Sequence, residues 1–371
     1  MSWVFWGSAA LIFYTYLGYP AWLYLRSRWK PFEVRREAIS PWVSIVMAVH
    51  NEADVLGAKL QNLSELDYPA DRLDLVVVSD GSSDGTDGIL ASWRGERRQA
   101  IIMPSNGGKA AALNVAVKAA RGDILIFTDA RQRLGAEALR CLVENFADAA
   151  VGCVSGELLL EQPQRKSSTN GLSLYWTIEK KIRQWEGASG SVVGVTGALY
   201  GARREYVPAL PVGTILDDVY IPLHVARLGK RVLFDARAQS YDQLANSRRE
   251  FWRKVRTLAG NYQLVQLAPW LLTASNPMRF RFVSHKLLRL LMPFALLGIL
   301  VSSLALNSLL YRLALAGELS LCLCSVLVAF HVRLGALSRL GEACSAFLVL
   351  NAAAAVAFLY FVTGRRVAWT R

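Results

Sequence analysis

Long apolar stretches near both ends of the chain frame a middle region of mixed character. Residues 3–25 carry no charge and are numerous enough to cross a bilayer as a helix. Basic residues follow this stretch, and no small-residue cleavage site is evident. Residues 1–30 are therefore expected to form a retained transmembrane helix rather than a secretory signal. Toward the other end, residues 290–310, 313–330 and 344–362 predict about three further spans within residues 290–371, the first two joined by a short link at Tyr311 and Arg312.

Short apolar runs alternate with helical patterns between residues 41 and 262. WVSIVMAVH, LDLVVVSD and DILIFTDA have the length and continuous apolar character of buried strands. Strands of this kind that alternate with helices predict an α/β domain with a mostly parallel sheet. Such sheets bind ligands beyond the carboxyl ends of their strands. The residues that follow these ends, and that we expect to share one site, are His50, Asn51, Glu52, Asp80 and Asp129.

Residues 263–289 link this domain to the C-terminal spans. They interleave aromatic and basic residues, as in Trp270 and the run MRFRFVSHKLLR. This composition beside a span is typical of an amphipathic helix at the membrane surface. The segment is expected to hold the site against the bilayer.

Composition supports a membrane protein and argues against nucleic acid as a partner. The chain has 371 residues, of which 53% are hydrophobic, and a net charge of +13. Its arginines cluster beside the predicted spans, which is the positive-inside pattern and places the domain in the cytoplasm. Four spans would put the C-terminus outside, yet Arg365, Arg366 and Arg371 lie there, so the number of crossings stays open. Five scattered cysteines form no metal-binding pattern and fit a reducing compartment.

The acidic residues at the strand ends have structural as well as functional explanations. Ser83, Asp84 and Thr86 belong to a turn-rich loop and are expected to form the turn and cap the next helix. Asp80 stands at the strand terminus itself, where its carboxylate can accept a hydrogen bond from a base N–H or a ribose hydroxyl. Asp129 either caps the following turn or binds a hard divalent cation together with phosphate oxygens.

Three further groups of charged residues suit a phosphate-bearing substrate. Lys109 opens a predicted helix, where its ammonium could face a phosphate or be solvated. Asp217 and Asp218 are adjacent acids, and either a general base or an acidic first helical turn explains them equally well. A cluster of cations interleaved with Phe251 and Trp252 is expected to meet a diphosphate or anionic lipid: Arg248, Arg249, Arg253, Lys254 and Arg256.

Together these residues resemble the motifs of membrane-bound family 2 glycosyltransferases, which have the GT-A fold. The resemblance covers residues 41–262 and rests on AVHNE, VVSDGSSDGT, GGKAAALN, TDA at 128–130, GVTGALYGAR at 194–203 and LDD at 216–218. The first three are similar to the strand-end, nucleotide-binding and Gly-Lys blocks of the family. TDA occupies the place of its DxD motif, and LDD that of its TED or GDD motif. Among the members, the chain resembles processive synthases of the cellulose, hyaluronan and chitin type.

The resemblance implies a single inverting displacement on a nucleotide-diphosphate sugar, expected to be UDP-linked. It assigns Asp218 as the base that deprotonates the acceptor, with Asp217 in a supporting role. It also places Thr196, Gly197 and Trp252 on the acceptor side. The residues expected to bind the donor are His50, Asn51, Glu52, Asp80, Lys109, Asp129 and Arg253. Asp129 would in addition ligate a divalent cation, Mg²⁺ or Mn²⁺.

Two departures from the family pattern weaken parts of this assignment. Arg131 stands where the second acid of DxD is usual, which puts metal dependence in doubt. The Gln-x-x-Arg-Trp motif of processive synthases is represented by Glu250, Arg253 and Lys254, so only the arginine matches. This mismatch weakens the inference of processivity.

The acceptor remains open between two kinds of molecule. The favoured function is elongation of a polysaccharide at the membrane, and the alternative is transfer of one sugar to a lipid or lipid-linked acceptor. A third hypothesis, an inactive membrane scaffold, is disfavoured because the acids and Arg253 are all present. The expected setting is the plasma membrane or bacterial inner membrane, in contact with membrane lipid. A homo-oligomer or an export partner would help to frame a channel for a polymer.

Overall fold

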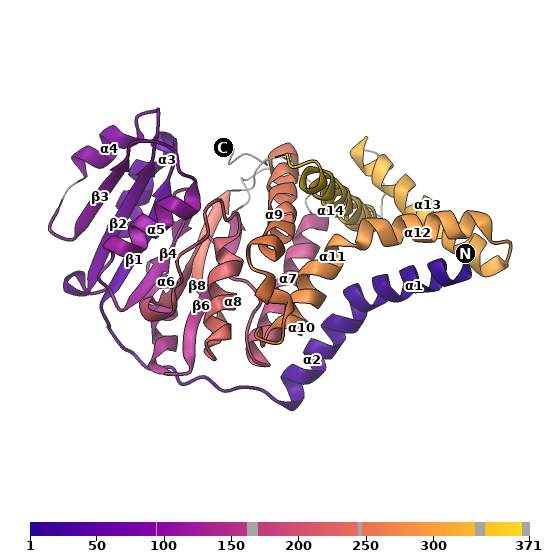
Figure 1. Cartoon of the computed structure of the whole chain (residues 1–371), viewed down its shortest axis with the longest axis horizontal. Helices are drawn as coiled ribbons and strands as arrows, with labels where there is room; N and C mark the ends of the chain where they lie inside the picture. The colour runs from indigo at the N-terminus through magenta and orange to yellow at the C-terminus, as the bar shows by residue number, and fades with distance from the viewer. Residues whose placement is uncertain (94, 162–169, 244–246, 331–337, 366–371) are drawn as a thin grey trace.

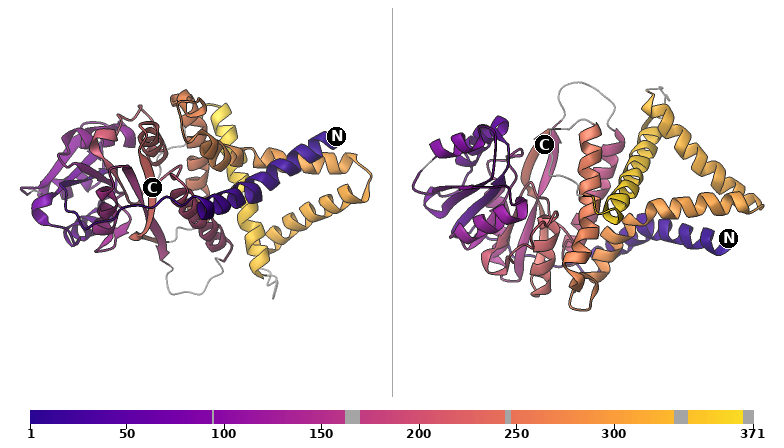
Figure 2. Two further views of the ribbon diagram at one scale, coloured as in Figure 1. Left: turned by 90° about the horizontal axis from the view of Figure 1, so that it is seen from below. Right: turned by 45° about the horizontal axis from the view of Figure 1, so that its top comes forward.

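The computed structural model describes residues 1–93, 95–161, 170–243, 247–330 and 338–365. A sheet covered by helices occupies one end of the molecule, and a group of long helices extends from it at the other end (Figure 1). The N-terminal helix runs beside α12 in every view, so the first residues of the chain join the C-terminal helices (Figures 1 and 2).

The sheet has eight strands in the order β3-β2-β1-β4-β7-β6-β8-β5. The first four strands pair in parallel, as do β6 and β8, whereas β7 and β5 pair antiparallel with their neighbours. Their bounds are β1 Val43–Val49, β2 Leu73–Asp80, β3 Arg98–Met103, β4 Ile124–Phe127, β5 Arg133–Leu134, β6 Val151–Glu161, β7 Tyr200–Arg203 and β8 Arg231–Gln243. The predicted mostly parallel sheet is confirmed, with an antiparallel strand inserted beside β4.

The strands are continuous apolar runs because helices cover both faces of the sheet. Every residue of β1 is buried. On one face Leu113 of α5 and Ile221 of α8 belong to one core cluster. On the other face Leu60 of α3 and Leu142 of α6 belong to a second cluster. The bounds of these layers are α3 Ala53–Ser64, α4 Thr86–Ser92, α5 Lys109–Ala119, α6 Ala138–Val143 and α8 Asp217–Arg227, with short 3₁₀ turns η2 Ala70–Arg72, η3 Glu144–Ala147 and η4 Arg204–Tyr206.

Two long helices stand between the sheet and the apolar helices. They are α7 Asn170–Ala188 and α9 Ser247–Leu267. Both pack against α14, and α7 also packs against α2 and β8. They therefore connect the sheet to the apolar end of the molecule, and α9 continues beyond residue 262, where the sequence predicts the end of the domain.

Two helices among the described residues are long and apolar enough to cross a membrane, over Leu309–Val328 and Leu340–Val362. The pair Arg279–Leu290 and Met292–Ala305 would make a third span, although it bends by 54° between its two parts. The full bounds are α12 Met292–Ala305, α13 Leu309–Ala329 and α14 Ser338–Val362. The predicted link at Tyr311 and Arg312 is wrong, because both residues lie inside α13 and the turn precedes it.

The N-terminal stretch is helical throughout, from α1 Ser2–Phe13 through the π-helical η1 Tyr14–Gly18 to α2 Tyr19–Trp29. It is not among the described helices that satisfy the length and hydropathy required for a span. Its crossing of a membrane stays a prediction.

Residues 263–289 differ from the single interfacial helix that the sequence predicts. They form the end of α9 and then η5 Pro269–Leu272, α10 Arg279–Phe282, the π-helical η6 Val283–Leu287 and the start of α11 Leu288–Leu290. Arg281 and His285 are buried. The Arg281 guanidinium donates to the carbonyl oxygens of Glu186 and Ser189 at 2.6 and 2.7 Å. These polar side chains therefore face α7 inside the protein rather than the bilayer surface.

Candidate active site

Asp80 organises the loop that leads into α5. Its carboxylate is fully buried and accepts hydrogen bonds from the backbone N–H groups of Gly107 and Gly108, at 2.7 and 2.9 Å. Its carbonyl oxygen lies 2.8 Å from His50 Nδ1. The predicted contact of Asp80 with a base or ribose stays a prediction. What the structure shows is a carboxylate that fixes the two glycines directly before Lys109.

The strand-end loops after β1 and β2 are tied together by side chains that bond to backbone groups. The Ser83 N–H donates to Asn51 Oδ1 at 2.8 Å, while Asp84 accepts from the N–H groups of Ala53 and Thr86. Asp84 thus holds the first N–H of α4 from the residue before its N-cap, Gly85, within the turn that the sequence context predicts. Gly81 has φ +60, and a Cβ there would lie 2.4 Å from the backbone nitrogen of Asn106. This close approach requires glycine and brings the three loops to one edge of the sheet.

Lys109 joins the two acidic motifs that the sequence places far apart. Its Nζ lies 3.0 Å from Asp129 Oδ1 and 3.2 Å from Asp217 Oδ1. Burial opposes the charge on Lys109, but the three neighbouring aspartates outweigh it and raise its pKa. Asp217 also accepts from the buried Tyr200 hydroxyl at 3.4 Å. The supporting role predicted for Asp217 therefore has a geometric basis, since it holds the ammonium in place.

Gly197 marks the point at which the charged groups converge. A Cβ on this residue would lie 3.6 Å from Asp129 Oδ2, 3.8 Å from Asp218 Oδ2 and 4.0 Å from Lys109 Nζ. The carboxylate in the loop after β4, the carboxylate on α8 and the ammonium of α5 therefore face one small space. Any side chain at position 197 would fill part of that space.

Asp218 has the properties of a strong carboxylate base. Burial, and after it the charges of Asp217 and Asp129, raise its pKa to about 6 against the opposing effect of Lys109 and Lys286. Its backbone oxygen accepts from the Val195 N–H at 2.9 Å. This bond ties the first turn of α8 to the segment that carries Thr196 and Gly197.

Arg131 and Arg253 meet across the carboxylate of Asp242 on β8. Arg131 Nη2 lies 3.8 Å and Arg253 Nη1 3.7 Å from the Asp242 oxygens, and Arg253 also pairs with Glu250 at 2.7 Å. Asp242 is buried and accepts from Gln132 Nε2 at 2.9 Å. Arg131 and Glu250, two of the residues that depart from the family pattern, thus belong to one network with Arg253.

The described residues contain no group of three or more His, Cys, Asp or Glu side chains able to hold a metal ion. Asp129 is a single carboxylate that a metal ion could reach, since its side chain is 39% exposed and its Oδ2 faces the space at Gly197. A carboxylate oxygen suits a hard divalent cation, which would need other ligands from the substrate. The residues fit a metal shared with a diphosphate and do not form a site by themselves.

Lys59 is a residue that the sequence analysis missed. It lies on α3 with only 3% of its surface exposed, and its ammonium donates to Thr128 Oγ1 and to the Gln132 carbonyl oxygen, at 2.9 and 2.6 Å. Burial lowers its pKa to about 7. Through these two hydrogen bonds Lys59 fixes both ends of the loop that carries Asp129. Its position among the apolar residues of an amphipathic helix was the signal available in the sequence.

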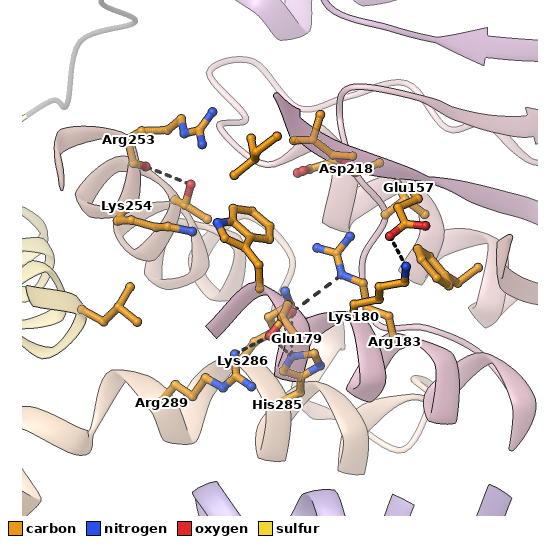
Figure 3. Close-up of a pocket in the computed structure, with 18 of the residues that line it drawn as sticks. Glu157, Glu179, Lys180, Arg183, Asp218, Arg253, Lys254, His285, Lys286 and Arg289 are labelled. Atoms are coloured by element: carbon orange, nitrogen blue, oxygen red, sulfur yellow. Dashed lines mark hydrogen bonds and ion pairs between the residues drawn. The ribbon is translucent and has the colours of Figure 1, made fainter. Parts of the chain in front are cut away.

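A cavity of about 520 Å³ opens beside Asp218 (Figure 3). Side chains from β6, α7, α9 and η6 line it, as does Leu350 of α14. Thr196, which the family resemblance places on the acceptor side, and Arg253 also line it. The other charged lining residues come from positions to which the sequence analysis gave no role: Glu157, Glu179, Lys180, Arg183, Lys286 and Arg289.

Trp252 is not among the residues that line this cavity. Its ring packs edge-on against Tyr360 of α14, with ring centroids 6.0 Å apart. Trp176 of α7 lines the cavity in its place, with the Lys254 ammonium 4.5 Å above its ring. The placement of Trp252 on the acceptor side stays a prediction, since its ring packs against α14 and is not part of the lining of this cavity.

Comparison with known proteins identifies the domain that carries these loops. Residues 44–209 match the family model described as Glycosyl transferase family 2. This stretch of the chain is therefore similar to the family 2 glycosyl transferases. The matched region holds the donor-side candidates from His50 to Asp129 together with Thr196 and Gly197.

The curated relatives are glycosyltransferases. The chain is 27% identical over 240 residues to "Probable glycosyltransferase YdaM" of Bacillus subtilis, which covers 61% of this chain and 56% of that protein. It is 28% identical over 207 residues to "Beta-monoglucosyldiacylglycerol synthase" of Trichormus variabilis, covering 53% and 42%. It is 23% identical over 234 residues to "Poly-beta-1,6-N-acetyl-D-glucosamine synthase" of Staphylococcus aureus, covering 60% and 55%. The chain thus spans about half the length of these relatives.

One solved structure resembles nearly the whole chain. It is the mannosyltransferase PcManGT from Pyrobaculum calidifontis in complex with GDP-Man and Mn²⁺, at a TM-score of 0.73 and 22% identity, covering 97% of this chain and 99% of that one. At this identity the likeness establishes the fold. The prediction of a GT-A fold flanked by apolar helices is confirmed.

Proposed function

We propose that the chain transfers a sugar, with inversion, from a nucleotide-diphosphate sugar to a hydroxyl of an acceptor held at a membrane. The observation that carries this proposal is the convergence of Lys109, Asp129 and Asp218 around Gly197. An ammonium for a diphosphate and a carboxylate base share one space, at the strand ends of a domain similar to the family 2 glycosyl transferases.

Asp218 acts as the general base in this proposal. Its carboxylate removes the proton of the acceptor hydroxyl while that oxygen attacks the anomeric carbon of the donor sugar. The bond from this carbon to the diphosphate oxygen breaks, and its electron pair leaves with the nucleoside diphosphate. A pKa of about 6 makes Asp218 a stronger base than an ordinary aspartate and still leaves it ionised near neutral pH.

The cations stabilise the leaving diphosphate. Lys109 lies beside Asp129 at the convergence point, and Arg131 and Arg253 lie together on Asp242. Charge-assisted contacts from such groups stabilise charge that develops as the bond breaks. Asp129 would hold a divalent cation, Mg²⁺ or Mn²⁺, against the diphosphate, where the cation neutralises part of its charge.

The nucleoside would lie against the loops tied together by Asp80 and Asn51. His50, Asn51 and Glu52 follow β1 at the edge of the sheet where these loops meet. A UDP-linked donor is the expectation that the family resemblance gives. Asp80 supports this site by fixing the Gly107–Gly108 backbone, whatever contact it makes with the nucleotide.

The acceptor would enter the cavity beside Asp218, from the side of α14. Leu350, which lines the cavity, belongs to a helix apolar enough to span a membrane, which supports an acceptor delivered at the bilayer. Named relatives include a synthase of a glucosyl lipid and one of a polysaccharide. We therefore keep both a growing polysaccharide and a lipid as acceptor classes.

The test is incubation of the purified, detergent-solubilised chain with a panel of labelled nucleotide sugars and a total membrane-lipid extract. Chain-length analysis of the labelled product then separates the classes. Long products support polysaccharide synthesis, and single additions to lipid support the lipid acceptor. Absence of both binding and turnover for every donor in the panel would overturn the proposal in favour of a scaffold.

A further inference from the structure

The cavity beside Asp218 carries more positive than negative charge. It is lined by six basic residues and three acidic ones: Lys180, Arg183, Arg253, Lys254, Lys286 and Arg289 against Glu157, Glu179 and Asp218. Excess charge of one sign in a partly buried space is costly unless an oppositely charged group enters it. The surplus therefore points to an anionic ligand.

The basic residues approach the cavity from three directions. Lys180 and Arg183 come from α7, Arg253 and Lys254 from α9, and Lys286 and Arg289 from the segment η6–α11. Figure 3 shows the pairs on separate walls around one space. A phosphate accepts hydrogen bonds on several oxygens that point in different directions, so donors arranged on three walls suit it.

Most of these cations form an ion pair with an acidic residue of the protein. Lys286 differs from them in this respect. Lys180 pairs with Glu157 at 2.5 Å, and Arg289 pairs with Glu179 at 2.8 Å. Lys286 makes no hydrogen bond or ion pair with any residue that the structure describes. It is half-buried in the cavity wall, so its ammonium is available to a ligand.

Lys286 also lies near the proposed base. Its Cε is 3.8 Å from the position of a Cβ on Gly194, and that position is 3.6 Å from the backbone oxygen of Asp218. A ligand held by Lys286 would therefore have its anionic group close to the hydroxyl that meets Asp218. A headgroup that carries both the anionic group and the accepting hydroxyl would fit this arrangement.

The remaining wall of the cavity is apolar. Leu158 and Leu160 of β6, Phe234 of β8, Leu258 of α9 and Leu350 of α14 contribute to it. Leu350 lies within the span Leu340–Val362. A ligand with an anionic headgroup and a hydrocarbon part could contact the basic residues with the headgroup and the apolar residues with the hydrocarbon part.

We propose that this cavity binds a lipid acceptor whose headgroup carries a phosphate close to the hydroxyl that receives the sugar. The inference rests on the proposed glycosyl transfer and selects, between its two acceptor classes, a phosphate-bearing lipid. Lys286 is the residue that binds the phosphate, and the paired cations Lys180, Arg183 and Arg289 hold the headgroup in the cavity, while Arg253 faces the leaving diphosphate.

The test compares two lipids that differ in the phosphate. Short-chain phosphatidylglycerol has hydroxyls and a phosphate, whereas short-chain diacylglycerol has a hydroxyl and no charge. Titration calorimetry with the full chain in detergent is expected to show about tenfold tighter binding of phosphatidylglycerol. Lys286→Met should remove most of this difference, while Lys118→Met, on the exposed end of α5, should leave it unchanged. Equal affinity for the two lipids, or a Lys286→Met protein that still prefers phosphatidylglycerol, overturns the inference.

Failure of this inference can be told apart from failure of the proposed transfer. The same preparations are incubated with labelled nucleotide sugars in the presence of either lipid. Transfer to diacylglycerol as good as transfer to phosphatidylglycerol would leave the transferase intact and overturn the phosphate requirement. A preference in binding without any donor binding or turnover would retain the lipid site and refute the transferase.

Discussion

The proposed donor side and the proposed acceptor side of the site are built in different ways. On the donor side, loops at the ends of β1 and β2 and before α5 are tied by hydrogen bonds to backbone groups, as Asp80 binds Gly107 and Gly108. On the acceptor side, long side chains from separate helices meet in ion pairs, as Arg289 and His285 meet Glu179. Backbone bonds fix a loop in one conformation, whereas lysine and arginine side chains can adapt to a ligand. The contrast suits a constant nucleotide and a variable acceptor.

Asp218 stands where the two sides meet, so the largest expected effect is at this residue. Asp218→Asn keeps the size of the side chain but removes the base, and the rate of sugar transfer should fall by about 10²–10⁴. Donor affinity should stay within about twofold, because the proposed donor contacts lie elsewhere. Steady-state kinetics and nucleotide-sugar binding measure the two. Asp123→Asn, on an exposed carboxylate before β4, serves as the control. Full activity of Asp218→Asn would refute its role as base.

Lys109→Met should damage both stability and donor binding. The change leaves Asp129 and the buried Asp217 facing each other without their shared ammonium, and loss of one partner of a buried ion pair costs about 3 kcal/mol. Urea unfolding in detergent measures this loss. The second change Asp217→Asn should restore part of it, since it removes one of the repelling charges. A Lys109→Met protein with unchanged stability would show that these ion pairs do not hold the donor side together.

The rate of transfer should depend on pH through Asp218. The base must be ionised to accept a proton, and its pKa is raised to about 6, so kcat/KM should rise between pH 5 and 7 and level off above. About tenfold is expected between pH 5 and the plateau, from the ionised fraction. Asp217→Asn removes a charge that raises this pKa and should move the rise to lower pH. A profile that is flat from pH 5 to 8 would contradict the raised pKa.

The same contrast explains how much the sequence could predict. The donor side lies in short motifs at strand ends, where the apolar run stops and the polar residues begin, so His50, Asp80 and Asp129 could be placed on one edge from the pattern. The acceptor side depends on packing between distant helices. Glu179 and His285 are 106 positions apart, and no local pattern reveals that they meet. The sequence analysis also misplaced the turn between α12 and α13. It took the polar residues Tyr311 and Arg312 for the turn, whereas both lie within α13.

Trp252 and Trp176 provide the smallest and most direct test of the acceptor side. Trp252 packs against Tyr360, so Trp252→Ala should lower stability by about 1 kcal/mol and leave the transfer rate within about twofold. Trp176→Ala is the matched change inside the cavity, where the ring lies beneath the Lys254 ammonium. It should lower kcat/KM for the acceptor several-fold, by about the value of a cation–π contact, without altering donor affinity. If Trp252→Ala impairs acceptor use more than Trp176→Ala does, the acceptor lies against the apolar helices, and the cavity beside Asp218 is not its binding site.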